Sequence, residues 1–568
     1  NFTGMPNLEK LDLSWCSHLE EVHYSLGCCS KLIRLDLRWC KSLKRFPCVN
    51  VESLEYLGLE YCNRLEKFPE IHGRMKPGVQ IHMLPSGLRE LPSSVFQYQT
   101  HITELDLSGM RNLVALPSII CRLKSLVSLN VSDCYRLETL PEEIGDLDNL
   151  EELDANYTLI SRPPSSIIRL NKLKILKFGG FKNRVHFEFP PVAEGLRSLE
   201  HLDLSCCKLT DGGLLEDIGS LSSLKKLALG GNDLVVLPSS ICRLKNLVSL
   251  DVCKCLKLES LPEEIGDLDN LEELDAGYTL ISRLPSTIVR LNKLKVLKLA
   301  RCFRYNRVHF EFLLAEGLRS LEHLDLSRCK LTDGELPEDI GSLSSLKKLK
   351  LSGNNFEHLP RSIAQLGALR SLNLSYCERL TQLPEFPPEL NKLHVDYLMA
   401  LKFIHDLVTK RKKLQRVIFA PMYGKDDADN DSIYNLLAHA LFQKISSLRH
   451  DISVSDSLSE NVFTIWHPEK KIPSWFLHQG TDSSVSVNLP ENWYIRDKFL
   501  GFAVCYDGSL IDTTTQLIPV CDDGMSCMTQ KLTLSECDTE PSRDSNRYTP
   551  IHFFLVPLAV LWDTSKAK

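Results

Sequence analysis

Cysteine has the widest choice of chemistry among the residues of this chain, since a thiol can form a disulfide, bind zinc or act as a nucleophile. Nine of the 20 cysteines occupy one position of a repeated motif. On successive coils such residues stack roughly 4.8 Å apart. We therefore expect small buried side chains with free thiols, in a reducing compartment. The nine are Cys16, Cys40, Cys62, Cys134, Cys207, Cys255, Cys302, Cys329 and Cys377.

Motifs for other cysteine chemistry and for phosphate binding do not occur in the sequence. It has no Cys-x-x-Cys pair to begin a zinc site and no G-x-x-x-x-G-K-[ST] loop to hold a nucleotide. Cys505, Cys521, Cys527 and Cys537 have no histidine arranged by a recognisable nucleophile motif, and the 17 histidines show no ligand pair above chance. The sequence predicts no enzymatic activity, no metal and no cofactor.

A column of aromatic residues indicates protein binding instead. Large aromatic side chains with a polar tip are favoured as anchors at protein interfaces. Six of them immediately precede the Cys or Thr position of the motif, where a strand should end and the side chain should be at least partly exposed. The alternative is that they only cover the edge of the core. The six are Trp15, Trp39, Tyr61, Tyr157, Tyr278 and Tyr376.

Leucine-rich repeats are the elements that must position these residues. Residues 126 to 147 read L-x-x-L-x-L-x-x-C-x-x-L-x-x-L-P, so Leu129 and Val131 should point into a core while Asn130 and Ser132 point outward. The first residues of the units, about 24 apart, are Leu8, Leu32, Leu54, Gly78, Ile102, Leu126, Leu150, Leu173, Leu199, Leu224, Leu247, Leu271, Leu294, Leu321, Leu346, Leu369 and Leu390.

Each unit should supply one strand of a parallel sheet on a concave side and an L-P turn or short helix on the convex side. The predicted fold is therefore an α/β leucine-rich-repeat solenoid, a horseshoe of about 17 repeats. A short helical segment and a β-sandwich domain should follow it.

A block of five repeats occurs twice. Residues 121–160 recur at 242–281, and the offset between the copies is 121 to 123 residues. Positions that differ should lie on or just after strands, on the solvent side. They reflect either free drift or diversification of a binding face, and they add Asn130, Ser132, Asp133, Lys254 and Arg301 to the candidate protein-binding residues. The pairs are Asn130 and Asp251, Ser132 and Cys253, Asp133 and Lys254, Asn156 and Gly277, Gly180 and Arg301, and Ala228 and Lys350.

The repeat spacing ends after residue 395. Leu398, Leu401, Ile404 and Val408 have helix spacing, and the basic run 410–416 is an import signal, a phosphate-binding patch or a solvated helix end. Beyond a linker rich in Ser and Asp, residues 483–489 and 499–505 are predicted strands. We divide the chain into repeats at 1–395, a helical connector and linker at 396–461, and a β-sandwich domain at 462–568.

Charge and hydropathy exclude two classes of partner. A net charge of −6 and a pI near 6.3 argue against a protein that mainly neutralises nucleic-acid phosphates. The longest apolar stretch, residues 551–562, contains His552 and Pro557 and predicts buried strands rather than a membrane span. The chain starts at Asn1 without a leader, so we expect a fragment of a longer protein.

The repeats, joined to residues 471–508, resemble plant intracellular TIR-NB-LRR disease-resistance receptors over essentially the whole chain. The more specific part resembles the jelly-roll and immunoglobulin-like domain, C-JID, that follows the repeats in that family. It is incomplete here if the chain stops before its last strands. The motif residues are Pro473, Trp475, Phe476, Trp493, Gly501 and Phe502.

The resemblance implies a module that recognises a pathogen effector, in the cytoplasm and also the nucleus. Its partners would be the effector and the TIR and NB domains of the full receptor, which would oligomerise on activation; neither nucleic acid nor membrane is expected. The family's NAD-hydrolysing TIR domain and NB switch domain are not in this chain.

Two other classes remain open. An extracellular repeat receptor or inhibitor would fit the N-x-[ST] sites, although the units carry L-P where the extracellular plant type usually has G-x-I-P. The substrate-recognition arm of a ubiquitin ligase is the other, although the sequence supplies no catalytic half. The N-x-[ST] sites begin at Asn1, Asn130, Asn156, Asn373 and Asn430.

Overall fold

The computed structural model describes two long stretches and several shorter ones. Residues 1–301 are described except 51, 69–70, 73–78, 84–85, 92, 97–100, 181–185, 193–194 and 212–213, and residues 317–396 are described throughout. Beyond them lie 402–403, 416–420, 462–467, 501–507, 513–516, 531–534 and 549–557. The chain forms two compact units, Asn1–Glu311 with Ala315–Leu318, and Phe312–Leu314 with Arg319–Lys568.

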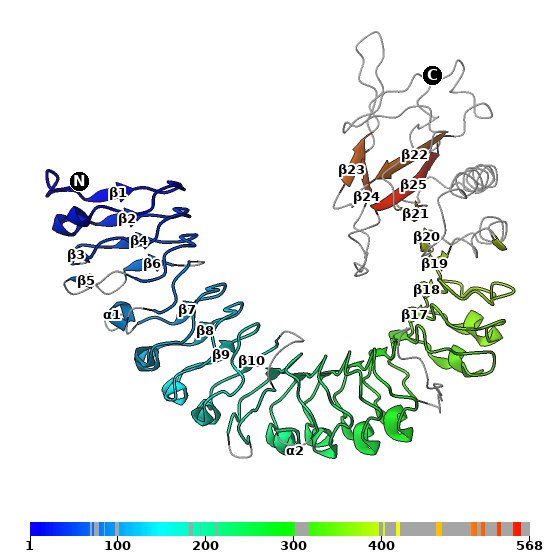
Figure 1. Cartoon of the computed structure of the whole chain (residues 1–568). Helices are drawn as coiled ribbons and strands as arrows, with labels where there is room; N and C mark the ends of the chain where they lie inside the picture. The colour runs from blue at the N-terminus through cyan, green and yellow to red at the C-terminus, as the bar shows by residue number, and fades with distance from the viewer. Residues whose placement is uncertain are drawn as a thin grey trace, which may run out of the picture. The chain divides into compact units, whose positions relative to one another are not determined.

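Among the described residues, 17 strands each begin two positions after a repeat marker, which confirms the leucine-rich-repeat fold (Figure 1). They are β1 (Lys10–Asp12), β2 (Arg34–Asp36), β4 (Tyr56–Gly58), β6 (Gln80–His82), β7 (Glu104–Asp106), β8 (Ser128–Asn130), β9 (Glu152–Asp154), β10 (Ile175–Lys177), β11 (His201–Asp203), β12 (Lys226–Ala228), β13 (Ser249–Asp251), β14 (Glu273–Asp275), β15 (Val296–Lys298), β16 (His323–Asp325), β17 (Lys348–Lys350), β18 (Ser371–Asn373) and β19 (Lys392–Asp396).

All these strands pair in parallel within their unit. In the first unit β1, β2, β4 and β6 form one sheet and β7 to β15 another, and two short strands, β3 (Val49–Asn50) and β5 (Ile71–His72), pair separately. In the second unit β16 to β19 are parallel. The register aligns the leucines, as Leu129 opposite Leu105 and Leu153 shows.

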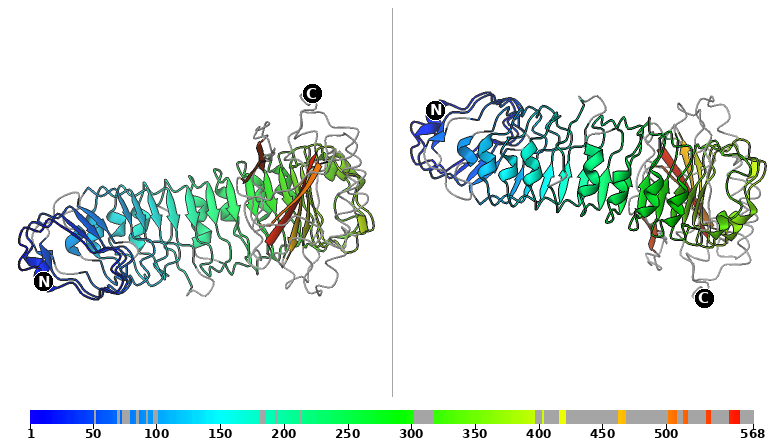
Figure 2. Two further views of the ribbon diagram at one scale, coloured as in Figure 1. Left: turned by 90° about the horizontal axis from the view of Figure 1, so that it is seen from above. Right: turned by 90° about the horizontal axis from the view of Figure 1, so that it is seen from below.

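The core is a file of leucines that alternate with outward side chains. Leu129 and Val131 are fully buried, and each fully buried apolar side chain contributes about 1.5 to 3 kcal/mol. Successive coils of the first unit stack on one another, as the two views in Figure 2 show, and these residues are buried between them. No single coil could bury its own apolar edge.

The cysteine column lies within this core. The Cys134 thiol donates to Leu107 O at 3.2 Å and the Cys255 thiol to Leu229 O at 3.2 Å, each a carbonyl of the preceding coil. None of the described cysteines between residues 1 and 396 forms a disulfide. Cys16, in the coil of β1, was predicted to be buried but is exposed; Cys40 and Cys62 are each covered by the coil on their N-terminal side, where their thiols donate to Leu13 O and Leu37 O. Cys302 lies outside the described residues.

The convex side carries short 3-10 helices rather than long α-helices, so the helical content is low. In Figure 1 they lie on the side of each coil away from the strands. Most begin after the Pro of L-P, whose fixed φ suits the helix entry. They are η1 (Tyr24–Cys28), η2 (Ser118–Arg122), η3 (Ile144–Asp146), η4 (Ser165–Arg169), η5 (Ile218–Ser220), η6 (Ser239–Arg243), η7 (Glu263–Asp267), η8 (Ser286–Arg290), η10 (Ile340–Ser342) and η11 (Arg361–Gln365), with α1 (Ser93–Phe96) and α2 (Leu214–Asp217) as single α-turns.

Parallel pairing continues past residue 395. β20 (Arg416–Ala420) pairs with β19, and β21 (Val462–His467) pairs with β20. Of the helix predicted from residue 396, the described positions 402–403 are helical, and the strand at 416–420 was not predicted. The division into domains at 395 and 461 stays a prediction.

The other pairings of the described strands beyond residue 460 are antiparallel. β25 (Thr549–Pro557) pairs with both β21 and β22 (Gly501–Asp507), and β23 (Thr513–Gln516) pairs with β24 (Lys531–Leu534). β22 confirms the strand predicted at 499–505, shifted by two residues. None of the helices in the described part has the length and apolar character that crossing a bilayer requires.

Candidate functional site: the outward strand face and its aromatic column

The aromatic column lies at strand ends in a left-handed backbone conformation. Tyr157 has φ 56°, and its N–H donates to Gly179 O at 2.7 Å on the next coil. This turn directs the following Cys, Thr or Asn into the core. The members described with positive φ are Trp15, Trp39, Tyr61, Gly109, Asp133, Tyr157, Cys206, Gly231, Lys254, Tyr278, Arg328, Gly353 and Tyr376.

The exposure of the aromatic members varies along the column. Trp15 is 68% exposed, Tyr157 43% and Tyr278 39%, whereas Trp39 and Tyr376 are half-buried. A non-glycine residue in the left-handed region costs roughly 1–2 kcal/mol. The exposed aromatic residues therefore occupy positions where glycine would have less backbone strain. Gly109 occupies such a position in its own coil.

Three rings of the column form a continuous stack. Trp15 and Trp39 are parallel within 4° with centroids 4.6 Å apart, and Trp39 and Tyr61 are within 14° at 3.8 Å. Lys41 Nζ lies 5.3 Å from the centroid of Trp39. Each stacked pair contributes about 0.5–1.5 kcal/mol beyond burial, which offsets part of the backbone strain. The stack makes this part of the surface rigid.

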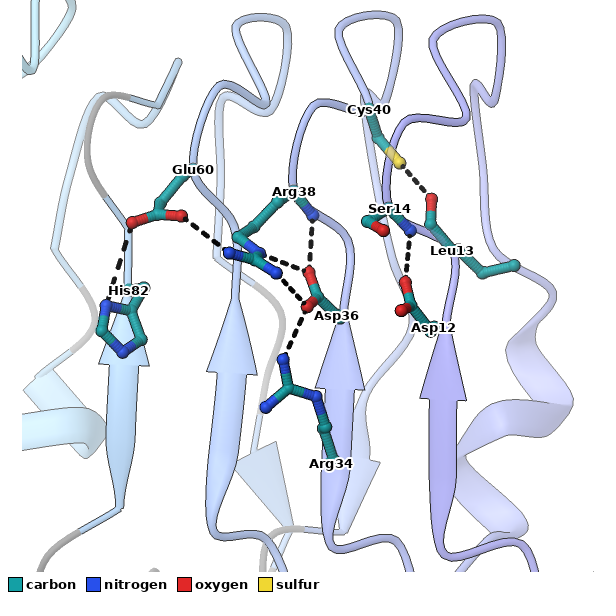
Figure 3. Close-up of polar contacts among 9 residues, drawn as sticks. All are labelled: Asp12, Leu13, Ser14, Arg34, Asp36, Arg38, Cys40, Glu60 and His82. Carbon is teal, nitrogen blue, oxygen red and sulfur yellow. Dashed lines mark hydrogen bonds and ion pairs between the residues drawn. The ribbon is translucent and has the colours of Figure 1, made fainter.

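A charged network lies on the neighbouring strands (Figure 3). Asp36 is fully buried, accepting from Arg38 Nε and Nη2 at 2.8 Å each and from Arg34 Nη2 at 2.9 Å. Arg38 also approaches Glu60 at 3.9 Å, and Glu60 is 3.8 Å from His82. Burial would raise the pKa of Asp36, but the hydrogen bonds from Arg38 and Arg34 outweigh burial and lower it.

An acidic or amide side chain at the last residue of the strand has a structural role. Asn130 Oδ1 accepts from Ser132 N at 3.0 Å, and Asp251 Oδ1 from Cys253 N at 2.8 Å. The same bond occurs in ten described coils. It fixes the turn into the left-handed residue. Asn130 and Asp251 therefore form the same turn, although Asp251 carries a negative charge and Asn130 does not.

The other diverged candidates do not all face solvent. Ser132, Asp133 and Lys254 are half-buried on the outward side of the strand ends. Arg301 was predicted on the solvent side but is only 5% exposed, and its guanidinium donates to Ile281 O. Its equivalent Gly180 is buried as well. Arg301 is therefore a buried structural residue.

One cluster of carboxylate and thiol side chains in the described part of the chain has the spacing of possible metal ligands. Ligand atoms of Asp251, Cys253 and Asp275 lie within 4.8 Å of one another. Asp251 already binds the backbone, and Asp275 pairs with Lys298 at 3.1 Å. Burial, with a further contribution from Asp251, raises the pKa of the Cys253 thiol. These partners account for the group without a metal.

The C-terminal candidates are described only in part. Gly501 and Phe502 begin β22, whereas Pro473, Trp475, Phe476 and Trp493 lie outside the described residues. Sequence reasoning missed the left-handed column and the strand-end turns. Gly109, Gly231 and Gly353 in the same column, together with the recurrent L-D-L-S, are the signals that could have revealed both.

Family models and relatives agree on the kind of protein. Residues 467–568 match the C-JID domain, 293–493 a leucine-rich repeat region, 50–140 the leucine-rich repeats of "Disease resistance protein RPS4B-like", and 195–216 a leucine-rich repeat. The chain is 58% identical over all its 568 residues to TMV resistance protein N of Nicotiana glutinosa. It spans 38% of that relative's length.

Two further matches are more distant. A probable disease resistance protein of Arabidopsis thaliana, At4g19520, is 30% identical over 462 residues, which cover 81% of this chain and 25% of the relative. The solved LRR protein LIC12759 of Leptospira interrogans is 27% identical, with a TM-score of 0.41, over 68% of this chain and 93% of its own.

Proposed function

Because this chain corresponds in sequence to the leucine-rich-repeat and C-JID region of a plant TIR-NB-LRR disease-resistance receptor, we propose that it recognises a pathogen effector protein by binding it. The TIR and NB domains of the full receptor are its intramolecular partners. Effector binding releases restraint on these domains and allows the receptor to oligomerise. The chain itself contributes recognition and no catalysis.

The observation that carries this proposal is the exposed aromatic column on a rigid parallel sheet. Tyr157 and Tyr278 project from equivalent coils of the duplicated block, and each is about two-fifths exposed. Aromatic side chains with a fixed backbone lose little entropy on binding and are frequent anchors of protein interfaces. The outward strand face therefore suits a protein ligand.

We place the receptor in the cytoplasm, with the nucleus as a second location. Two of the N-x-[ST] asparagines support this location over an extracellular one. The side chains of Asn130 and Asn373 accept hydrogen bonds from Ser132 N and Ser375 N at 3.0 Å. Both asparagines are half-buried at strand ends, where a bulky glycan on Nδ2 would crowd the neighbouring residues. No observation favours a role as the substrate-recognition arm of a ubiquitin ligase.

Co-purification of the full receptor with candidate effectors tests the proposal. Tyr157→Asn and Tyr278→Asn remove the rings, and Asn tolerates positive φ. We expect the double variant to lose effector binding, since each anchor is worth about 2 kcal/mol or more. Tyr24→Asn, a more exposed tyrosine in η1 on the convex side, is the matched control. Effector capture that does not depend on residues 1–568 would refute the proposal.

A further inference from the structure

Two outward faces within the first unit lie five coils apart. The first is formed by β7 to β10 and the second by β12 to β15. β8 to β10 and β13 to β15 are copies of each other, whereas β7 and β12 are the strands that precede them. Each three-residue strand presents its first and last side chains outward, and the left-handed residue after the second strand of each face adds one more. The same backbone therefore displays two different sets of side chains.

The two faces differ in charge. The first face has five carboxylates and one cation, Lys177. The carboxylates are those of Glu104, Asp106, Asp133, Glu152 and Asp154. The equivalent positions of the second face have three lysines, Lys226, Lys254 and Lys298, and three carboxylates, Asp251, Glu273 and Asp275. Asp251 is in place of Asn130, and Ala228 is in place of Asp106. The first face therefore carries a strong excess of negative charge, and the second is balanced.

Three of the five carboxylates on the first face form no ion pair among the described residues. Lys177 Nζ pairs with Asp154 at 2.9 Å and Glu152 at 3.5 Å. Among the ion pairs of the described residues, none includes the other three carboxylates, Glu104, Asp106 and Asp133. Glu104 and Asp106 are also exposed to solvent.

The first face also borders exposed tyrosines. Tyr135 is 37% exposed, its hydroxyl donates to Asp133 Oδ1 at 3.0 Å, and Arg111 lies 5.7 Å from its ring centroid. The hydrogen bond to Asp133 raises the pKa of Tyr135. The second face keeps Tyr278 but has Leu256 at the position of Tyr135.

We propose that the β7 to β9 face, with Tyr135 and Tyr157, binds a partner-protein segment that carries Arg or Lys side chains beside apolar ones. This deepens the proposed function and rests on it. Tyrosine faces attract cations while also burying apolar area, and the unpaired carboxylates favour a basic segment and repel an acidic one. The first face is therefore charge-selective and the second is not.

A defined peptide tests this inference on the whole 568-residue chain. The probe is a fluorescein-labelled peptide of four Arg-Leu-Ser repeats, and its counterpart is four Glu-Leu-Ser repeats. Anisotropy should show binding of the Arg peptide that weakens with added salt, and no saturable binding of the Glu peptide. Equal binding of the two peptides would overturn the inference.

Exchanging residues between the two faces tests where on the chain the Arg peptide binds. Placing second-face residues into the first, Glu104→Lys, Asp106→Ala, Asp133→Lys and Tyr135→Leu, should weaken Arg-peptide binding by about 10-fold or more. The control changes the formal charge equally at exposed residues on and beside η3, with Glu142→Lys, Glu143→Ala and Asp148→Lys, and should change binding by no more than about 2-fold. An equal loss of Arg-peptide binding in the control variant would mean that binding depends only on the net charge of the chain, and it would overturn the inference.

The reciprocal exchange keeps the inference testable if the first variant folds poorly. Lys226→Glu, Ala228→Asp, Lys254→Asp and Leu256→Tyr should create a second site and about double the bound peptide at saturation, with circular dichroism confirming the fold. Unchanged stoichiometry would overturn the inference. If an effector binds the receptor while both exchanges leave the Arg peptide unaffected, the proposed function stands and the charge-selective site does not.

Discussion

Replacing one buried asparagine should loosen two coils of the first unit. Asn232 is 2% exposed, and its side chain makes four bonds to the backbone. Its Oδ1 accepts from Cys207 N at 2.9 Å and Leu209 N at 3.0 Å, and its Nδ2 donates to Leu204 O at 2.9 Å and Leu229 O at 2.7 Å. Asn232→Ala leaves two buried N–H groups and two carbonyls without these partners, at about 1 kcal/mol each, so we expect a loss of about 4 kcal/mol.

Hydrogen exchange read by mass spectrometry can localise this effect. A loss of about 4 kcal/mol corresponds to roughly a thousandfold faster exchange in peptides from residues 200 to 235. Asn246→Ala is the control, since its exposed side chain donates only to Ser222 O at 2.9 Å and should cost about 1 kcal/mol or less. If the two variants exchange alike, the four bonds do not stabilise the coils as argued.

Three more predictions concern backbone strain and ionisation. Lys254 has φ 60°, so Lys254→Val should be about 1 kcal/mol less stable than Lys254→Gly; equal melting temperatures by scanning fluorimetry would contradict this. Burial raises the pKa of Cys134 and Cys255 to about 12, so their contribution to stability is complete below pH 9 and falls as pH rises toward 12, while the unfolded thiols ionise. Urea unfolding should show a smaller loss between pH 8 and pH 10.5 when both are changed to Ala. The pKa of Asp36 is lowered by Arg38 against the effect of burial, so its contribution is present above about pH 4 and is lost below it; acid unfolding of Asp36→Asn should lack this component.

The sequence by itself determined the strand positions. A leucine period of about 24 residues fixes where each coil must return to the core, and every described repeat strand begins two residues after its marker. Burial of the cysteine column followed from the same period, as at Cys134. Cys16 differs because burial depends on contacts with a neighbouring coil, which a periodic pattern does not specify.

Only the tertiary structure decided what the outward residues do. Asn130 and Asp251 look like free variation in sequence, yet both close the same strand-end turn. Arg301 looks exposed by position, yet it lies inside its coil. Residues on one outward face are separated in sequence by whole coils, so their combined charge arises from the stacking of coils. Local sequence specifies each coil, whereas the surface that could recognise a partner belongs to several coils together.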